Sequence, residues 1–130
     1  MTGWTADELD RIGAAEELQI AARRRDGSLR RPVPIWVVRV GDDLYVRSWR
    51  GAGGSWYRTA HATHQAHISA GAVDRDVSLT EAWDHLDDAI DTAYRAKYGR
   101  YSGYVEPMIA PQARGTTLRV LPRANGGGAT

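Results

Sequence analysis

Residues 32–58 read PVPIWVVRVGDDLYVRSWRGAGGSWYR, which combines two strand-like runs with a turn and a glycine-rich loop. The first run, 32–40, is apolar at nearly every position, as is typical of a strand covered on both faces. The second run, 44–49, alternates between two faces, as in a strand with one buried side. Between them, residues 41–43 are glycine and aspartate, which tolerate turn conformations. The sequence therefore predicts an antiparallel hairpin.

The glycine-rich segment at 50–54 interrupts the strand pattern after the hairpin. Glycines leave backbone N–H groups unhindered, and loops of this kind can bind anions. The spacing fits neither a Walker motif nor a dinucleotide fingerprint, and a flexible loop without a ligand is the alternative. Because basic and aromatic side chains flank the segment, we predict a ligand site here. These neighbours are Arg47, Arg50, Trp56 and Tyr57.

The composition is that of an ordinary globular chain, with 130 residues, 42% hydrophobic and 25% charged residues, and a net charge of +1. So small a charge gives no global field that favours nucleic acid or an anionic membrane. The absence of cysteine excludes disulfides, zinc–thiolate sites and thiol nucleophiles. Because neither a signal peptide nor a membrane-spanning run is evident, we expect a cytoplasmic protein with no nucleic-acid or membrane partner. We expect one domain over 1–122 and a disordered tail over 123–130.

Helices and further strands surround the hairpin in the predicted order. Thr5 and Glu8 form a capping box that opens a short helix over 4–13. Ser78 and Glu81 form a second box, and the apolar spacing after it predicts the longest helix over 80–98. The other predictions are strands at 17–24, within 67–77 and at 116–121, a short helix at 56–63 and a loop at 101–112 with one helical turn around Met108. Together they predict a mainly β fold with helices (α+β): a small six-stranded β-barrel with a short N-terminal helix and one long C-terminal helix.

Motifs over nearly the whole chain resemble a family of small bacterial proteins of unknown function. They are IAARRRDG at 20–27, PVPIWVV at 32–38, LYVRS at 44–48, WYR at 56–58, YRAKYG at 94–99 and TLRVLP at 117–122. More distantly, the arrangement is similar to deazaflavin-dependent nitroreductase-like proteins of the flavin-binding split-barrel class. That resemblance implies that the six-stranded barrel is a split β-barrel, and that the protein is oxidoreductase-like and binds a flavin or deazaflavin as a small-molecule ligand. A barrel without any cofactor is equally compatible with the sequence.

The resemblance also implies roles for individual residues. A basic hairpin would hold the cofactor phosphate through Arg24, Arg25 and Arg30, because guanidinium groups bind such oxygens well. A solvated hairpin tip is the alternative. The cofactor ring would lie against Ser48, Gly51, Gly53, Gly54 and Trp56. Aromatic walls suit flat ligands, and the substrate would contact Trp36, Trp49 and Tyr94.

Two functions without a cofactor stay open at this point. A cofactor-independent enzyme would isomerise, cyclise or hydrolyse a hydrophobic secondary metabolite, with Tyr57, His61 and Arg47 as its candidate catalytic residues. A barrel filled by its own aromatic side chains would be a non-catalytic interaction module.

Metal binding and oligomeric state are two further expectations. His61, His64 and His67 recur every third residue, but they cannot share one helical face if His67 opens a strand, so we predict no metal site. We expect a homodimer, because so small a barrel leaves apolar strand faces to cover. Trp36 and Tyr45 are the candidates for its interface.

Overall fold

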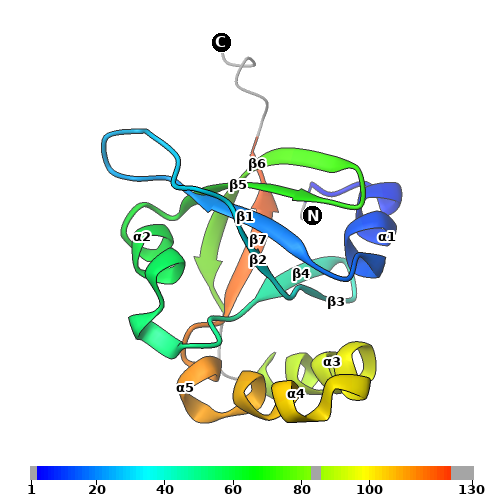
Figure 1. The fold of residues 1–130 in the computed structure, drawn as a ribbon. Coiled ribbons are helices and arrows are strands. Elements are labelled where there is room, and N and C mark those ends of the chain that lie inside the picture. The colour runs from blue at the N-terminus through cyan, green and yellow to red at the C-terminus, as the bar shows by residue number, and fades with distance from the viewer. Residues whose placement is uncertain (1–2, 83–85, 124–130) are drawn as a thin grey trace.

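The computed structural model describes residues 3–82 and 86–123. Within these residues, one antiparallel sheet of seven strands has the order β2-β1-β5-β6-β7-β4-β3. The strands are β1 (Leu18–Ala22), β2 (Val33–Ile35), β3 (Val38–Val40), β4 (Asp43–Val46), β5 (Gln65–Ala70), β6 (Val73–Glu81) and β7 (Leu118–Pro122). The sheet curls strongly on itself (Figure 1). This confirms the predicted α+β split barrel, with seven strands where six were predicted.

The run at 32–40 forms two strands, and the prediction of a single strand was wrong. β2 pairs with β1, whereas β3 pairs with β4, so the two halves lie at opposite ends of the strand order. Only Trp36 and Val37 separate them, and the chain therefore steps from one edge of the sheet to the other within two residues. An apolar pattern shows that a strand is covered, but it does not show where its pairing partner changes. The predicted hairpin is present as β3 and β4.

Tyr98 holds the step between β2 and β3. Its ring stacks on the Trp36 ring with centroids 4.0 Å apart, and its hydroxyl accepts a hydrogen bond from the Val37 N–H (3.3 Å). The same hydroxyl donates to the Glu16 carbonyl (2.9 Å). Lys97 Nζ donates to the Val37 carbonyl (2.7 Å), and its burial lowers the pKa of that amine to about 8. Both polar groups of Val37 are thus satisfied by side chains where the ladder is interrupted.

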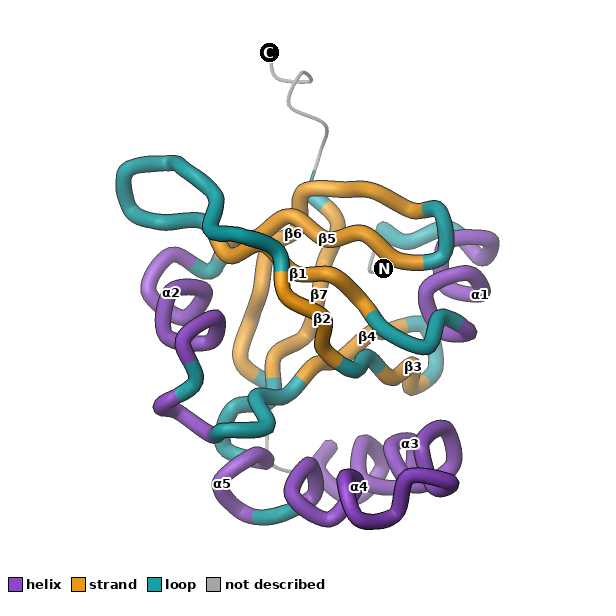
Figure 2. The backbone as a smooth tube through the Cα atoms, viewed as in Figure 1, coloured by secondary structure: helices purple, strands orange, loops and turns teal. Residues whose placement is uncertain are grey.

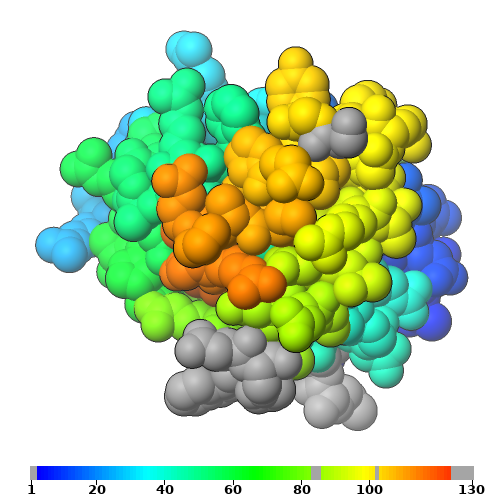
Figure 3. Space-filling model, turned by 90° about the horizontal axis from the view of Figure 1, so that it is seen from below, coloured from blue at the N-terminus to red at the C-terminus, as the bar shows by residue number. Residues whose placement is uncertain are grey.

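Five α-helices cover the sheet, as Figures 1 and 2 show for the described residues. α1 (Ala6–Ala14) and α2 (Ser55–Thr63) flank it, while α3 (Asp87–Tyr98), α4 (Ser102–Ile109) and α5 (Pro111–Arg114) form a layer below it. Figure 3 shows that layer from below. The short 3₁₀ turns η1 (Gly51–Gly53) and η3 (Gly99–Tyr101) precede α2 and α4. The capping box that begins α1 is confirmed, since Thr5 Oγ1 accepts from the Glu8 N–H (3.1 Å) and Glu8 accepts from the Thr5 N–H (3.0 Å).

Two predictions in the second half of the chain were wrong. Ser78 and Glu81 do not cap a helix, because both lie in β6, where pairing with β7 outweighs the local capping signal. The long helix begins at Asp87 instead. The segment predicted as a loop with one helical turn around Met108 is largely helical: Met108 lies in α4, and α5 follows it, with Pro107 near the end of α4. Residues 83–85 of the predicted long helix, and the predicted tail apart from Arg123, lie outside the described residues.

Two apolar cores are present among the described residues. The first lies inside the curled sheet and includes Ile20, Val46 and Ile68. The second lies between the sheet and the helix layer and consists of Val38, Tyr45, Ile90, Tyr94, Tyr98, Val105 and Met108. Tyr45 is only 2% exposed, so its predicted place in a dimer interface was wrong. None of the described helices has the length and apolar character that crossing a bilayer requires.

Candidate functional site

A pocket of about 420 Å³ lies where β2, the end of β4, the start of α2 and α4 meet. This volume is within the range of small-molecule sites. Its polar lining comes from Glu17, Arg47, Ser48, Arg50, Gly54 and Ser55. The rest is apolar or aromatic: Val33, Pro34, Ile35, Trp36, Trp49, Trp56, Tyr104 and Met108. The lining is therefore suited to a flat, largely apolar ligand with a few polar atoms.

Ser48 lies just beyond β4 and faces the start of α2. Its backbone N–H donates to Thr116 Oγ1 (2.8 Å), but its buried hydroxyl has no hydrogen-bond partner among the described residues. The residue is only 1% exposed. A Cβ added to Gly54 would lie 2.5 Å from Ser48 Oγ, so glycine is what allows the chain to pass so close to this hydroxyl. An unpaired buried hydroxyl is uncommon in folded proteins.

The start of α2 leaves backbone donors unpaired by side chains. Gly54 is the N-cap and has no side chain that could accept a hydrogen bond. The first bond within the helix runs from the Arg58 N–H to the Gly54 carbonyl (3.0 Å). The N–H groups before Arg58 carry the positive end of the helix dipole, and they lie at the pocket because Gly54, Ser55 and Trp56 line it.

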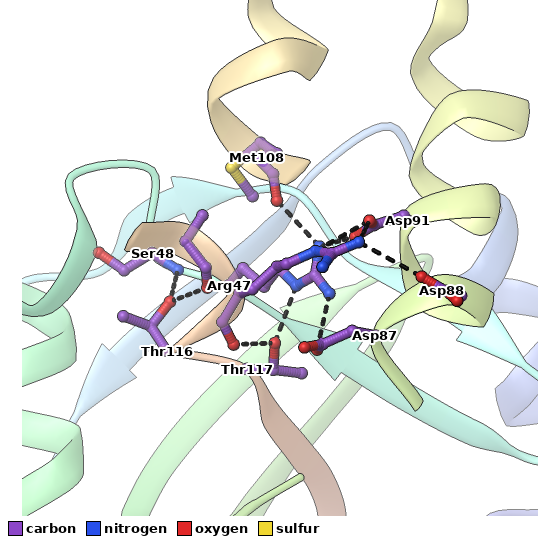
Figure 4. A network of polar contacts seen from close by, with 10 residues as sticks. Arg47, Ser48, Asp87, Asp88, Asp91, Met108, Thr116 and Thr117 are labelled. Carbon is purple, nitrogen blue, oxygen red and sulfur yellow. Dashed lines mark hydrogen bonds and ion pairs between the residues drawn. The ribbon is translucent and has the colours of Figure 1, made fainter. Parts of the chain in front are cut away.

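Arg47 is buried beside the pocket and holds part of the pocket wall in place. It is 1% exposed, and its guanidinium is engaged on several sides (Figure 4). Its hydrogen-bond partners are Asp91 (2.5 Å), Thr117 Oγ1 (2.8 Å), the Met108 carbonyl (3.0 Å) and Asp87 (3.2 Å). The network ties β4 to α3, α4 and the start of β7, and it fixes Met108 in the pocket wall. This favours a supporting role for Arg47 over direct action on a substrate.

Asp91 is the buried carboxylate of this network, at 2% exposure. It accepts hydrogen bonds from Arg114 as well as from Arg47. Burial alone would raise the pKa of Asp91, but the two guanidinium groups outweigh it and hold that pKa below its usual value. The carboxylate therefore stays ionised, as a paired buried charge does.

A shallower cleft of about 350 Å³ adjoins the pocket and is lined by Arg30, Ser55, Arg58 and Thr59. Arg30 donates to the Ser55 carbonyl (2.9 Å) and to Thr59 Oγ1 (3.0 Å), which holds its side chain against α2. Arg58 is exposed and forms no ion pair with any residue in the described part of the chain. Ser55 lines both cavities, so a ligand in the pocket can extend into a cleft with two cationic side chains.

Comparison with known proteins identifies the family. Residues 8–120 match the family described as "Uncharacterized protein conserved in bacteria (DUF2255)". The chain belongs to this family. Comparison with curated proteins finds no match.

Solved structures resemble this chain at low sequence identity. A crystal structure of a FAD-binding protein from Mesorhizobium loti has 16% identity and a TM-score of 0.59, covering 93% of this chain and 91% of that one. An F420-H2 dependent reductase has 14% identity and a TM-score of 0.60, covering 82% and 93%. A domain-swapped dimer has 15% identity and a TM-score of 0.60, covering 82% and 79%. At these identities the likeness shows the split-barrel fold, and it agrees with the distant resemblance seen in the sequence.

The pocket brings together six of the residues predicted to form a site: Trp36, Arg47, Ser48, Trp49, Gly54 and Trp56. Gly51 and Gly53 lie in η1, directly before them. Tyr94 is fully buried in the second core and Tyr57 is 7% exposed in the first, and neither lines the pocket. His61 is exposed and pairs with Glu81 (2.8 Å).

The three arginines predicted to bind phosphate lie in two different places in the structure. Arg30 lies in the cleft beside α2. Arg24 donates to Ser28 Oγ and to the Leu29 carbonyl (both 3.2 Å), within the turn after β1. Arg25 is exposed in the same turn. Arg58, which sequence reasoning did not single out, lies beside Arg30 instead.

Sequence reasoning also missed the contribution of α4. Tyr104 and Met108 line the pocket from a segment that was predicted to be a loop with only one helical turn, around Met108. They are four residues apart, which is the spacing of one helical face, and this was the available signal. Pro107 and Gly103, which are unfavourable inside helices, made this segment look like a loop.

The histidines at 61, 64 and 67 do not converge on one point. The His67 ring lies between Asp74 and Asp76, with Nδ1 2.8 Å from the Asp76 carboxylate and Nε2 against Asp74. The rings of His61 and His64 are 5.6 Å apart. Among the described residues there is no group of three or more His, Asp or Glu side chains that is arranged to hold a metal ion.

Proposed function

We propose that this protein binds a flavin or deazaflavin in the pocket beside α2 and acts as an oxidoreductase-like protein. The observation that carries the proposal is the lining: aromatic rings on several sides and an adjoining cationic cleft. Two structures of the same fold, one of a FAD-binding protein and one of an F420-H2 dependent reductase, support it.

The proposed ring position lies between Trp36 and Trp56, with Ser48 and Gly54 at its inner end. The phosphate position lies in the cleft of Arg30 and Arg58, because planar guanidinium forks match phosphate oxygens. Ser55 would lie beside the link between the two. Arg24 and Arg25 are farther along the turn and would serve only a longer anionic tail.

Hydride transfer would be the chemistry of the cofactor. The chain would bind the ring, orient it and exclude water from one of its faces. Glu17 and Arg50 are the charged residues of the pocket lining besides the buried Arg47, so they are placed to orient a polar group on a substrate.

We include a homodimer in the proposal. Trp49 and Tyr104 are 49% and 63% exposed at the pocket, and Trp36 is half-buried beside them. A second copy placed over these rings would cover apolar surface and enclose the ligand. Light scattering coupled to gel filtration tests this, and a monomer at micromolar concentration would contradict it.

An absorbance titration with FMN, FAD and coenzyme F420 tests the proposed ligand. We expect saturable binding of at least one of them. Arg58→Ala should weaken binding of the phosphorylated ligand about tenfold, because it removes one charge-assisted hydrogen bond, while the matched variant Arg25→Ala should change it little. No saturable change with any of the three would contradict the proposal. A larger effect of Arg25→Ala would move the phosphate position to the turn.

A further inference from the structure

We propose that the pocket selects flat aromatic molecules that carry a cationic nitrogen, and that Glu17 recognises this cation together with the aromatic rings around it. The inference deepens the proposed function by naming a class of substrate, and it rests on that function for the pocket being the substrate site. A carboxylate beside exposed aromatic rings is a combination of groups that attracts an organic cation.

The first step concerns the position of Glu17. Leu18 of β1 pairs with Ile35 of β2, and continuing this antiparallel register by one residue places Glu17 opposite Trp36. Residues that lie opposite each other in such a register project from the same face, so these two side chains are neighbours. Both line the pocket. The carboxylate therefore lies at the wall that Trp36 forms.

The second step concerns the partners of that carboxylate. The Glu17 side chain is exposed and forms no hydrogen bond or ion pair with another residue in the part of the chain that the structure describes. The cations around the preceding residue are engaged elsewhere. Arg100 pairs with Glu16 (2.6 Å), and Lys97 Nζ donates to the Val37 carbonyl (2.7 Å). The oxygens of Glu17 are thus free for a group on a ligand.

The third step concerns the aromatic rings. One face of the Trp36 ring is stacked on Tyr98, with centroids 4.0 Å apart. Burial raises the pKa of Tyr98, and the negative charge of Glu17 is among those that add to the rise, so the carboxylate acts close to this stack. Trp49 and Tyr104 line the same pocket and are exposed. A cation is attracted to open ring faces, whereas an exposed carboxylate alone holds it weakly.

The fourth step concerns the other charges of the lining. The buried Arg47 adds little free charge, since Asp87 and Asp91 pair with it. Arg50 is exposed and comes from the segment after β4, whereas Glu17 precedes β1. Among the described residues that line the pocket, Glu17 is the only carboxylate. A cationic nitrogen therefore has one partner for its charge, and Arg50 is left for a polar atom at the other end of the ligand.

The test compares three probes on the full chain and on variants of it. 2-Naphthylmethylamine is protonated near neutral pH, 2-naphthylmethanol is its uncharged counterpart, and 2-naphthoate carries the opposite charge. Glu17→Gln removes the charge with little change of shape, and the control Glu106→Gln makes the same change at an exposed position of α4 that does not line the pocket. Tyr104→Leu replaces an aromatic ring of the pocket by an apolar side chain. Isothermal titration calorimetry measures the dissociation constants.

In the wild type, 2-naphthylmethylamine should bind about tenfold more tightly than 2-naphthylmethanol, because only the amine is attracted to both the carboxylate and the ring faces. Glu17→Gln should remove most of that preference, while Glu106→Gln should keep it. Tyr104→Leu should weaken binding of the amine more than binding of the alcohol, which separates a contact with the ring from a general attraction between charges. The thermal unfolding midpoint of Glu17→Gln should be unchanged, since this side chain loses no partner among the described residues.

Equal affinities of the wild type for the amine and the alcohol, or a preference that Glu17→Gln leaves intact, would overturn the inference. Tighter binding of 2-naphthoate that is lost in Arg50→Gln would also overturn it, because Arg50 would then select the charge of the ligand. Binding of none of the three probes would overturn it as well. The proposed function fails separately: it is contradicted if FMN, FAD and F420 do not bind while the amine binds through Glu17, and it stands if they bind although Glu17→Gln leaves the preference intact.

Discussion

The charged side chain of Arg47 is buried between the sheet and the helix layer. Its neighbours Asp87 and Asp91 come from α3, the Met108 carbonyl from α4 and Thr117 from the segment before β7. Taking these groups out of water costs free energy, and the dense set of partners offsets that cost. The sequence offered Arg47 as a candidate for catalysis because it lies next to the glycine loop. Its partners are 40 to 70 residues away along the chain, so no local pattern could have predicted the network.

Arg47→Met should lower the free energy of unfolding by about 3 kcal/mol, because it leaves the buried Asp91 with a less complete set of partners. Urea denaturation measures this. Arg31→Met, at an exposed arginine without an ion-pair partner among the described residues, is the matched control and should change stability by less than about 0.5 kcal/mol. A loss below about 1 kcal/mol for Arg47→Met would show that the network does not hold the helix layer on the sheet.

His67 makes stability depend on pH. Burial lowers its pKa, but hydrogen bonds to Asp76 and Asp74 outweigh burial and raise it above the ordinary value. The stabilisation is therefore complete below the unfolded-state pKa of about 6.5 and is lost as pH rises through the higher folded-state pKa. The pKa of Asp76 is lowered chiefly by its hydrogen bond with His67, so the stabilisation also fails as pH falls through that lowered value.

His67→Asn should therefore cost most stability near about pH 5.5 and least near about pH 9. The difference should be at most about 1 kcal/mol, because the cluster is partly exposed to solvent. Urea unfolding at both pH values measures it. His64→Asn is the control, since His64 has a left-handed backbone (φ 59°) that asparagine accepts. A cost of His67→Asn that is the same at both pH values would contradict the assignment.

At the scale of elements, local signals were reliable where an element depends on its own residues. The capping box of Thr5 and Glu8 begins α1 as predicted, and the turn before Val73 joins β5 to β6. The Ser78 and Glu81 box has the same residue pattern but lies in β6, because β7 pairs along that whole stretch. The two boxes differ only in tertiary context, which one sequence does not reveal.

Tyr94 and Tyr98 offer a matched pair on one helix. Both are fully buried in the second core, but only the Tyr98 hydroxyl forms hydrogen bonds, to Val37 and Glu16, whereas the Tyr94 hydroxyl reaches no partner in bonding geometry. Tyr98→Phe should lower the free energy of unfolding by about 2 kcal/mol, because it leaves the buried Val37 N–H unpaired. Tyr94→Phe should cost less than about 0.5 kcal/mol or stabilise. Equal costs in thermal unfolding would contradict the role of Tyr98 at the step between β2 and β3.

At the scale of the whole molecule, the fold class could be predicted from the sequence, but the order of the strands in the sheet could not. Alternation and turns predict short antiparallel strands, and the family resemblance implies a split barrel. The sheet order places β7 between β6 and β4, a pairing that depends on contacts far apart in the chain. The same limit applies to the pocket. Ser48 and Trp56 were predicted because they adjoin the glycine loop, whereas Tyr104 and Arg58 needed the three-dimensional arrangement of α4 and α2.

The central claim is that a flat ligand lies among the aromatic rings beside α2, and a crystal structure of the protein soaked with FMN or coenzyme F420 tests it most directly. We predict electron density for the ring between Trp36 and Trp56, with the phosphate near Arg30 and Arg58. Ring density on another face of the molecule, or a pocket that stays filled by water at saturating ligand, would contradict the account.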